Sequence, residues 1–216
     1  MKGQIFIPTD APKDWQRFLA DPEKQWRDGY SAKSTAVHWE NSKGLPADIE
    51  SILKTSGFNS PELLLAIPEW KTPLPGGRRE SQTDVFALVK STVGLVVCAI
   101  EAKVAEPFGP TVGEWLVNAS DGKKIRIEYL KTLLGLSTDI EHLRYQLLHR
   151  TASAIIEAKN FNAHAAAMIV QSFHPEALWK EDLEAFAIAM GLRLGILEET
   201  KQGASLLLGW SSPSLP

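Results

Sequence analysis

The sequence has a single cysteine, no long hydrophobic run and only a small excess of acidic residues. With Cys98 alone, a disulfide within the chain is excluded, so we expect a reducing compartment. No segment approaches the ~20 apolar residues of a membrane span. The apolar stretch in residues 1–8 is too short for a signal peptide. These absences predict a cytoplasmic protein without a membrane partner.

Charge and motif content exclude further classes. The net charge of −3 gives no overall basic signature, which counts against tight, non-specific nucleic-acid binding but leaves room for a local basic groove. The five histidines show no zinc-ligand spacing. The Walker, dinucleotide-binding and G-x-S-x-G motifs are also missing. The apolar share of 44% and charged share of 23% are ordinary, and 216 residues suffice for one domain with a full core.

An acid and a lysine end a run, 94–100, that is otherwise wholly apolar. Alternate residues of a strand share a face, so Glu101 and Lys103 continue the face of Val97 and Ala99. A strand that is apolar on both faces is a central, buried strand. A carboxylate and an ammonium are costly there unless they bind each other or a ligand.

A second acid, Asp84, opens another strand-like run upstream. A turn at 91–94 would join the two runs into a hairpin and bring Asp84 close to Glu101 and Lys103. Carboxylates hold hard cations such as Mg²⁺. A bound metal can polarise a phosphate and activate water, while a lysine stabilises charge or orients that water. The pattern therefore favours a metal site for phosphodiester hydrolysis.

Asp84, Glu101 and Lys103, in this order, resemble the motif of the PD-(D/E)XK nuclease superfamily, which has the restriction-endonuclease-like fold. Thr83 stands where the motif is named for a proline. The resemblance covers roughly residues 46 to 175. Two longer sequence segments, residues 26–32 and 106–109, look like those of an uncharacterised bacterial branch of the superfamily.

This resemblance implies a nuclease that depends on Mg²⁺ or Mn²⁺, with one or two ions. It implies that Asp84, Glu101 and the carbonyl of Ala102 bind metal and that Lys103 assists catalysis. The implied partner is nucleic acid, with DNA favoured over RNA, and a homodimer is left open.

Arginines and further acids complete the set of candidates. A long helix is predicted from the capping box at Thr138 to about Lys159. Arg144 falls within its apolar stripe, where it either holds a phosphate or snorkels to a salt bridge. Arg150, at the border of the stripe, is an accessory candidate.

Other candidates lie on neighbouring segments. Arg78 and Arg79 enter the Asp84 strand and either contact nucleic-acid phosphates or are loop charges. Accessory candidates are Gln82, which is expected to order Asp84, and Glu50 and Glu106, which also have a purely structural interpretation.

The order of expected elements predicts an α/β fold. From residue 46 it reads helix, strand, strand, strand, helix, strand, which is the core order of a restriction-endonuclease-like mixed sheet flanked by helices. We expect a helical N-terminal extension over 1–45, a nuclease-like domain over 46–210 with an insertion at about 106–136, and a flexible tail at 211–216.

Two rival interpretations stay open. One is a catalytically inactive protein of the same fold that serves as a nucleic-acid or protein interaction module. The other is a different α/β fold in which Glu101 and Lys103 simply pair.

Overall fold

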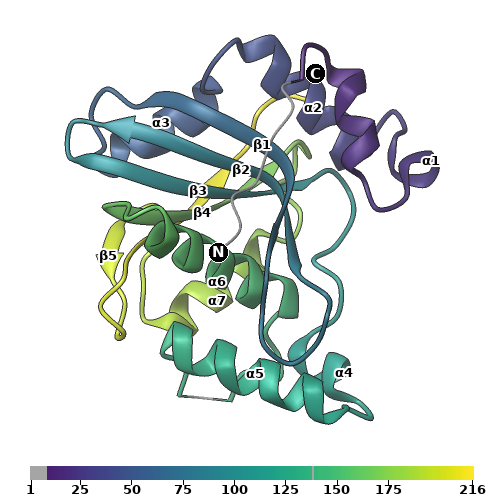
Figure 1. The fold of residues 1–216 in the computed structure, drawn as a ribbon, viewed down its shortest axis with the longest axis vertical. Helices are drawn as coiled ribbons and strands as arrows, with labels where there is room; N and C mark the ends of the chain where they lie inside the picture. The colour runs from purple at the N-terminus through teal and green to yellow at the C-terminus, as the bar shows by residue number, and fades with distance from the viewer. Residues whose placement is uncertain (1–8, 138) are drawn as a thin grey trace.

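A six-stranded mixed sheet runs through the centre of the protein, with helices on both faces (Figure 1). The structure is a computed structural model and describes residues 9–137 and 139–216. The predicted α/β class with a mixed, helix-flanked sheet is confirmed. The strands lie in the order β1-β2-β3-β4-β6-β5. Their bounds are β1 Glu62–Thr72, β2 Ser81–Ser91, β3 Gly94–Lys103, β4 Ala165–Ser172, β5 Leu197–Glu199 and β6 Ser205–Ser211.

The sheet has three antiparallel strand pairings and two parallel ones. Strands β1, β2 and β3 form an antiparallel meander. The β2–β3 turn is tight, and Gly94 (φ 134°) takes a backbone conformation open mainly to glycine. β4 then lies parallel to β3, and β6 parallel to β4, which requires helical crossovers. β5 and β6 form an antiparallel C-terminal hairpin.

Strand alternation in β3 sorts its side chains into two cores. Val97 and Ala99 pack in one core and Cys98 and Ile100 in the other, as the apolar run predicts. The first core lies under α4 Val112–Leu116, α5 Asp121–Leu134, α6 Tyr145–Asn160 and α7 Lys180–Met190. The second lies under η1 Pro12–Phe18, α2 Ser31–Ser42 and α3 Ala47–Thr55, with α1 Pro22–Gln25 beside them (Figure 1).

The N-terminal helices share the core of the sheet. Trp15 and Trp39 are buried in the same cluster as Ile100. The Trp39 indole Nε1 donates to Gln171 Oε1 of β4 at 3.1 Å. The segment before residue 46 is therefore packed onto the sheet.

The start predicted for the long helix is wrong, and two other elements also differ from what their prolines suggest. The long helix begins at Tyr145, and the cap proposed at Thr138 lies outside the described residues. The chain before the helix instead pairs with the start of α4 through a bridge between Thr111 and Arg144. β1 continues through Pro68 to Thr72, because an edge strand can accommodate a proline. The last long helix begins at Lys180, five residues after the proline at position 175.

The ends of the elements otherwise follow their local signals. A capping box formed by Thr111 and Glu114 opens α4. Gly135 ends α5 in the left-handed conformation. After Ser211 the chain has no helix or strand. Within residues 9–137 and 139–216, no helix has the length and apolar character needed to span a membrane.

Candidate active site

The paired strands β2 and β3 separate at one end, and the predicted acids lie at that point. The last paired residues are Val85 and Ile100, so Asp84 and Glu101 come directly after the ladder ends. The N–H of Ala102 has lost its partner on β2, and the Asp84 carboxylate accepts it at 2.7 Å. Asp84 thus replaces a missing ladder bond and is fixed next to Glu101.

Glu101 is buried (2% exposed) and is surrounded by donors. Its Oε1 accepts from Lys103 Nζ at 2.7 Å and from Gln146 Nε2 at 2.6 Å. Its Oε2 accepts from Arg150 Nε. Lys103 also donates to Gln146 Oε1 at 3.2 Å, so the amide bridges the lysine and the acid. Two cations and one amide therefore saturate the Glu101 carboxylate.

A third carboxylate, Glu69 of β1, joins the group and is absent from the sequence-based candidates. The ladder pairs Pro68 with Val85 and Trp70 with Thr83, which leaves Glu69 opposite Asp84. Its φ is 56°, a left-handed conformation that is uncommon outside glycine. Such strained backbones gather at functional sites.

The accessory candidate Gln82 forms a hydrogen bond with Glu69 of β1. Gln82 Nε2 donates to Glu69 Oε2 at 2.7 Å. The amide thus orients the third acid of the group, which comes from the neighbouring edge strand.

The three acids differ in charge state. Burial and the Glu101 carboxylate raise the pKa of Asp84 to about 7. Burial and the Asp84 carboxylate raise the pKa of Glu69 to about 8. Burial alone would raise the pKa of Glu101 as well, but Arg150 and Lys103 hold the pKa of that carboxyl at about 2. Glu101 is therefore firmly ionised, whereas Asp84 and Glu69 have pKa values close to neutral pH and exist there as a mixture of protonated and ionised forms.

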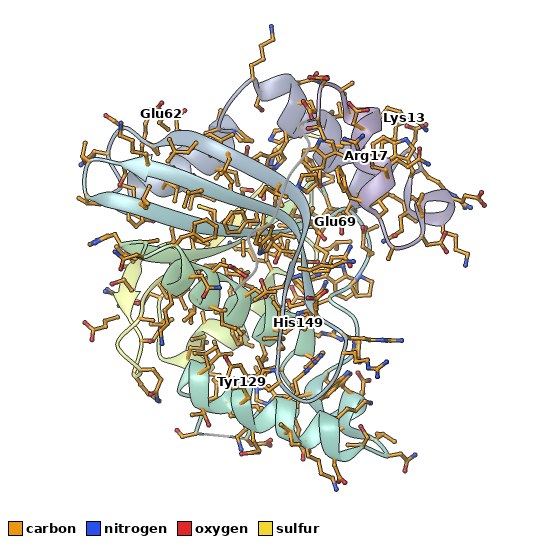
Figure 2. The ribbon with its side chains drawn as sticks, viewed as in Figure 1. Lys13, Arg17, Glu62, Glu69, Tyr129 and His149 are labelled. Carbon is orange, nitrogen blue, oxygen red and sulfur yellow. The ribbon has the colours of Figure 1, made fainter. Side chains whose placement is uncertain are left out.

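These groups line a cavity of about 620 Å³ between the sheet and the N-terminal helices. Figure 2 shows Glu69 at the end of the sheet nearest to those helices. Gln25, Tyr30 and Ser31 form the opposite wall. The N-terminal segment therefore closes one side of the candidate site, and its exposed Tyr30 lies at the wall of the cavity.

The helix residue that reaches the site is Arg150. Of the two interpretations of Arg144, the structure shows the salt bridge: the residue precedes α6 and its Nε donates to Asp182 Oδ2 at 3.0 Å. Arg144 does not line the cavity, which contradicts the alternative that it holds a phosphate there. Arg150 lies deeper in the helix, with 7% of its surface exposed, and lines the cavity together with Gln146.

A polar stripe on α6 marks the face that meets the sheet. Gln146, Arg150, Ser153 and Glu157 recur at helical spacing on this largely buried helix. Glu157 accepts from the Thr72 hydroxyl at 2.8 Å, beyond the site on β1. Polar residues repeated at this spacing beside an apolar stripe were the signal that could have identified Gln146 and Arg150.

The remaining candidates lie in three places. Glu50 pairs with Lys54 on α3 at 2.5 Å and does not line the cavity. Glu106 lines the cavity, but its carboxylate caps main-chain N–H groups, including that of Ser31 at 3.2 Å. Arg78 and Arg79 line a second cavity.

The donor set fits a hard divalent cation, although the acids are not arranged around one. Asp84, Glu69 and Glu101 offer carboxylate oxygens, which are the ligands of Mg²⁺ and Mn²⁺. Burial and a neighbouring carboxylate raise the pKa values of Glu69 and Asp84, and a bound cation would relieve the repulsion from that carboxylate. In the described part of the chain, however, no three acidic, histidine or cysteine side chains come close enough to hold a metal as they stand.

The fold and site define an α/β protein with a cavity lined by acids, a lysine and an arginine. The chain belongs to the family described as Domain of unknown function (DUF6946), whose model matches residues 8–214. Comparison with curated proteins and with solved structures finds no match. The function must therefore be argued from the site.

Proposed function

We propose that the protein is a metal-dependent nuclease with a PD-(D/E)XK-type site. The observation that carries the proposal is the meeting of Asp84, Glu101 and Lys103 beside one cavity, at the point where β2 and β3 separate. Two carboxylates and a lysine are the groups that metal-assisted phosphodiester hydrolysis requires. The sequence order of helix and strands around them supports the same superfamily.

Each residue has a role that its contacts support. Asp84, Glu101 and the carbonyl of Ala102 would hold Mg²⁺ or Mn²⁺, with Glu69 as a further oxygen donor. The ion would supply Lewis-acid activation of the phosphate. Arg150 keeps Glu101 ionised and in place.

Lys103 is the group best suited to the reacting phosphate. The residue is only 4% exposed, yet it lines the cavity. It can turn from Glu101 and Gln146 toward a phosphate oxygen or a water molecule, because an ammonium has three donors.

A second candidate function follows from the saturated state of Glu101. Both of its oxygens already have cationic partners, which is the arrangement of a closed structural ion pair. A protein that keeps this network intact would be a catalytically inactive interaction module of the same fold.

Cleavage assays with matched variants test the nuclease proposal. We expect the purified protein to cleave DNA or RNA with Mg²⁺ or Mn²⁺ and not with EDTA. Asp84→Asn keeps an oxygen acceptor for the Ala102 N–H but removes the charge, and Lys103→Met removes the ammonium; both should lower the rate by at least about 100-fold. Glu62→Gln, at the far end of β1, is the matched control (Figure 2).

Two results separate the alternatives. If single- and double-stranded DNA and RNA all stay intact with either metal, or if Asp84→Asn cleaves like the wild type, the nuclease proposal is wrong. Calorimetry with Mg²⁺ and Mn²⁺ then tests the inactive module, which should take up neither ion.

A further inference from the structure

A second cavity, of about 440 Å³, lies between the β1–β2 loop and the start of α5. Its lining contains four basic residues, Arg78, Arg79, Lys123 and Arg126, and a single acid, Glu80. This local excess of positive charge occurs in a chain whose net charge is −3. Such a concentration of one sign in a concave site attracts anions.

The loop that carries Arg78 and Arg79 is fixed to α5 by main-chain contact. Figure 1 shows the β1–β2 loop extending from the sheet to α5. A Cβ on Gly76 would lie 2.1 Å from the carbonyl oxygen of Gly122, and one on Gly122 would lie 2.4 Å from that of Gly76. Only glycine at both positions permits this approach. Arg78 and Arg79 therefore extend from a loop that is fixed against α5.

Arg126 reinforces this attachment and adds charge. Its side chain is 7% exposed and donates to three main-chain carbonyls of residues 74–77, at 2.9, 3.2 and 3.4 Å. Among the described residues no carboxylate pairs with it. Its positive charge therefore stays uncompensated at the wall of the cavity.

Three basic side chains remain available to a ligand. Arg78 and Arg79 are exposed, and no ion pair holds them within the described part of the chain. Lys123 Nζ uses one donor on the Trp115 carbonyl at 2.5 Å and lies 4.8 Å from the centre of the Trp115 ring. Guanidinium groups bind phosphate oxygens in pairs, and an ammonium adds a point charge.

The second cavity adjoins the candidate active site along β2. Ser81 lines it, whereas Asp84, three residues further along the strand, lines the first cavity. Three residues of a strand span about 10 Å. The wall between the two cavities contains Arg150, whose Nη1 donates to Ser81 Oγ at 3.3 Å, and His149, whose Nδ1 lies 2.8 Å from Ser81 Oγ.

His149 adds a neutral donor to this wall (Figure 2). Burial and Arg150 hold the pKa of His149 well below its usual range, so the ring is neutral. Because Arg150 can only donate, the Nδ1 atom that faces it at 3.4 Å is an acceptor. The proton of the ring therefore lies on Nε2.

We propose that this basic cavity binds a phosphate group of a single-stranded segment of nucleic acid, whose adjoining phosphodiester reaches the first cavity. The proposal rests on the proposed function, because that function places the phosphodiester to be cleaved in the first cavity. Binding of a phosphate in the second cavity itself needs no metal. A cavity of this volume accepts a group of small-molecule size and not a double helix. The strand is therefore unpaired where it enters, about 10 Å from Asp84.

Binding measured without metal tests this proposal separately from catalysis. The probe is a fluorescently labelled single-stranded oligothymidylate, followed by anisotropy in EDTA with the full chain. We expect Arg78→Ala/Arg79→Ala to bind at least about tenfold more weakly than the wild type. The slope of log affinity against log salt should become shallower by about 0.7, as expected when one phosphate contact is lost from a single strand.

Control variants separate a local site from general charge. Lys54→Ala/Lys90→Ala removes the same charge from exposed positions on other elements and should bind like the wild type. Lys123→Gln should weaken binding of the oligothymidylate while leaving the sequence of the β1–β2 loop unchanged. Unchanged far-ultraviolet circular dichroism and thermal midpoints show that each variant folds.

Several outcomes overturn the proposal. It is wrong if Arg78→Ala/Arg79→Ala binds like the wild type, or if the two double variants weaken binding equally. It is also wrong if inorganic phosphate binds to the wild type but the oligothymidylate does not. Binding that survives in Asp84→Asn and is lost in the arginine variant supports it, even if no cleavage is ever observed.

Discussion

Neutralising Asp84 and neutralising Glu101 should change the stability of the protein in opposite directions. Burial and Glu101 raise the pKa of Asp84 from 3.8 to about 7, so the folded, metal-free protein binds this proton more tightly than the unfolded chain does. Stability therefore falls as the pH rises from about 4 to about 7. Asp84→Asn removes this penalty and should stabilise the metal-free protein above pH 7.

The magnitude follows from the size of the shift. A change of three pKa units corresponds to about 4 kcal/mol, and access of water to the cavity reduces this to roughly 2 kcal/mol. For a chain of this length, 1 kcal/mol moves the thermal midpoint by about 2–4 °C. We therefore expect Asp84→Asn to melt about 4–8 °C higher at alkaline pH and to match the wild type near pH 4.

Glu101→Gln should do the opposite. Its folded pKa of about 2 lies below the usual 4.5, so ionised Glu101 stabilises the fold at every pH above about 4.5. The variant leaves Lys103 and Arg150 buried without a carboxylate, which costs about 3–5 kcal/mol.

Thermal unfolding in EDTA between pH 4 and 9 measures both effects. Addition of Mg²⁺ or Mn²⁺ should raise the midpoint of the wild type but not that of Asp84→Asn. If both variants shift the midpoint in the same direction at alkaline pH, the assigned charge states are refuted.

Three further predictions concern the surrounding structure. Burial raises the pKa of the Cys98 thiol to about 12, so thiol reagents should label the protein only after denaturation, and rapid labelling of the native state would contradict this. Gln171→Leu leaves the Trp39 indole N–H without its acceptor and removes the donor to Asp48 Oδ2, and denaturant titration should show a loss of about 1–3 kcal/mol. Gly76→Ala, at φ 84° and with main-chain atoms in the way, should lower the free energy of unfolding by about 2–5 kcal/mol, whereas Gly44→Ala, with open space and an ordinary φ, should have little effect.

The strand part of the site was predictable because it depends only on alternation and a local turn. Val97 and Ala99 fix the face of Glu101, and the short β2–β3 turn fixes the register that brings Asp84 to it. Both rules act over a few residues. Glu69 was not predicted from the sequence, because the preceding Pro68 is more typical of a loop than of a strand. The left-handed backbone of Glu69 also breaks the alternation of β1.

The helix part of the site was not predictable in the same way. Arg144 and Arg150 lie six residues apart, and the choice between them depends on where the helix begins and how it rotates against the sheet. The bridge between Thr111 and Arg144 sets that start through a contact with a distant segment. The wall formed by Tyr30 depends on docking of the N-terminal helices, for which the local sequence contains no signal.

The arrangement of the meander has a consequence for the order of folding. Glu69, Asp84 and Glu101 come from three consecutive antiparallel strands, whose contacts are local in sequence and form early. Arg150 arrives only with α6, which precedes the long-range pairing of Ile100 with Ile169. We therefore expect the repulsion among the carboxylates to build up before its strongest counter-charge is in place, so that refolding slows as the pH rises through 7.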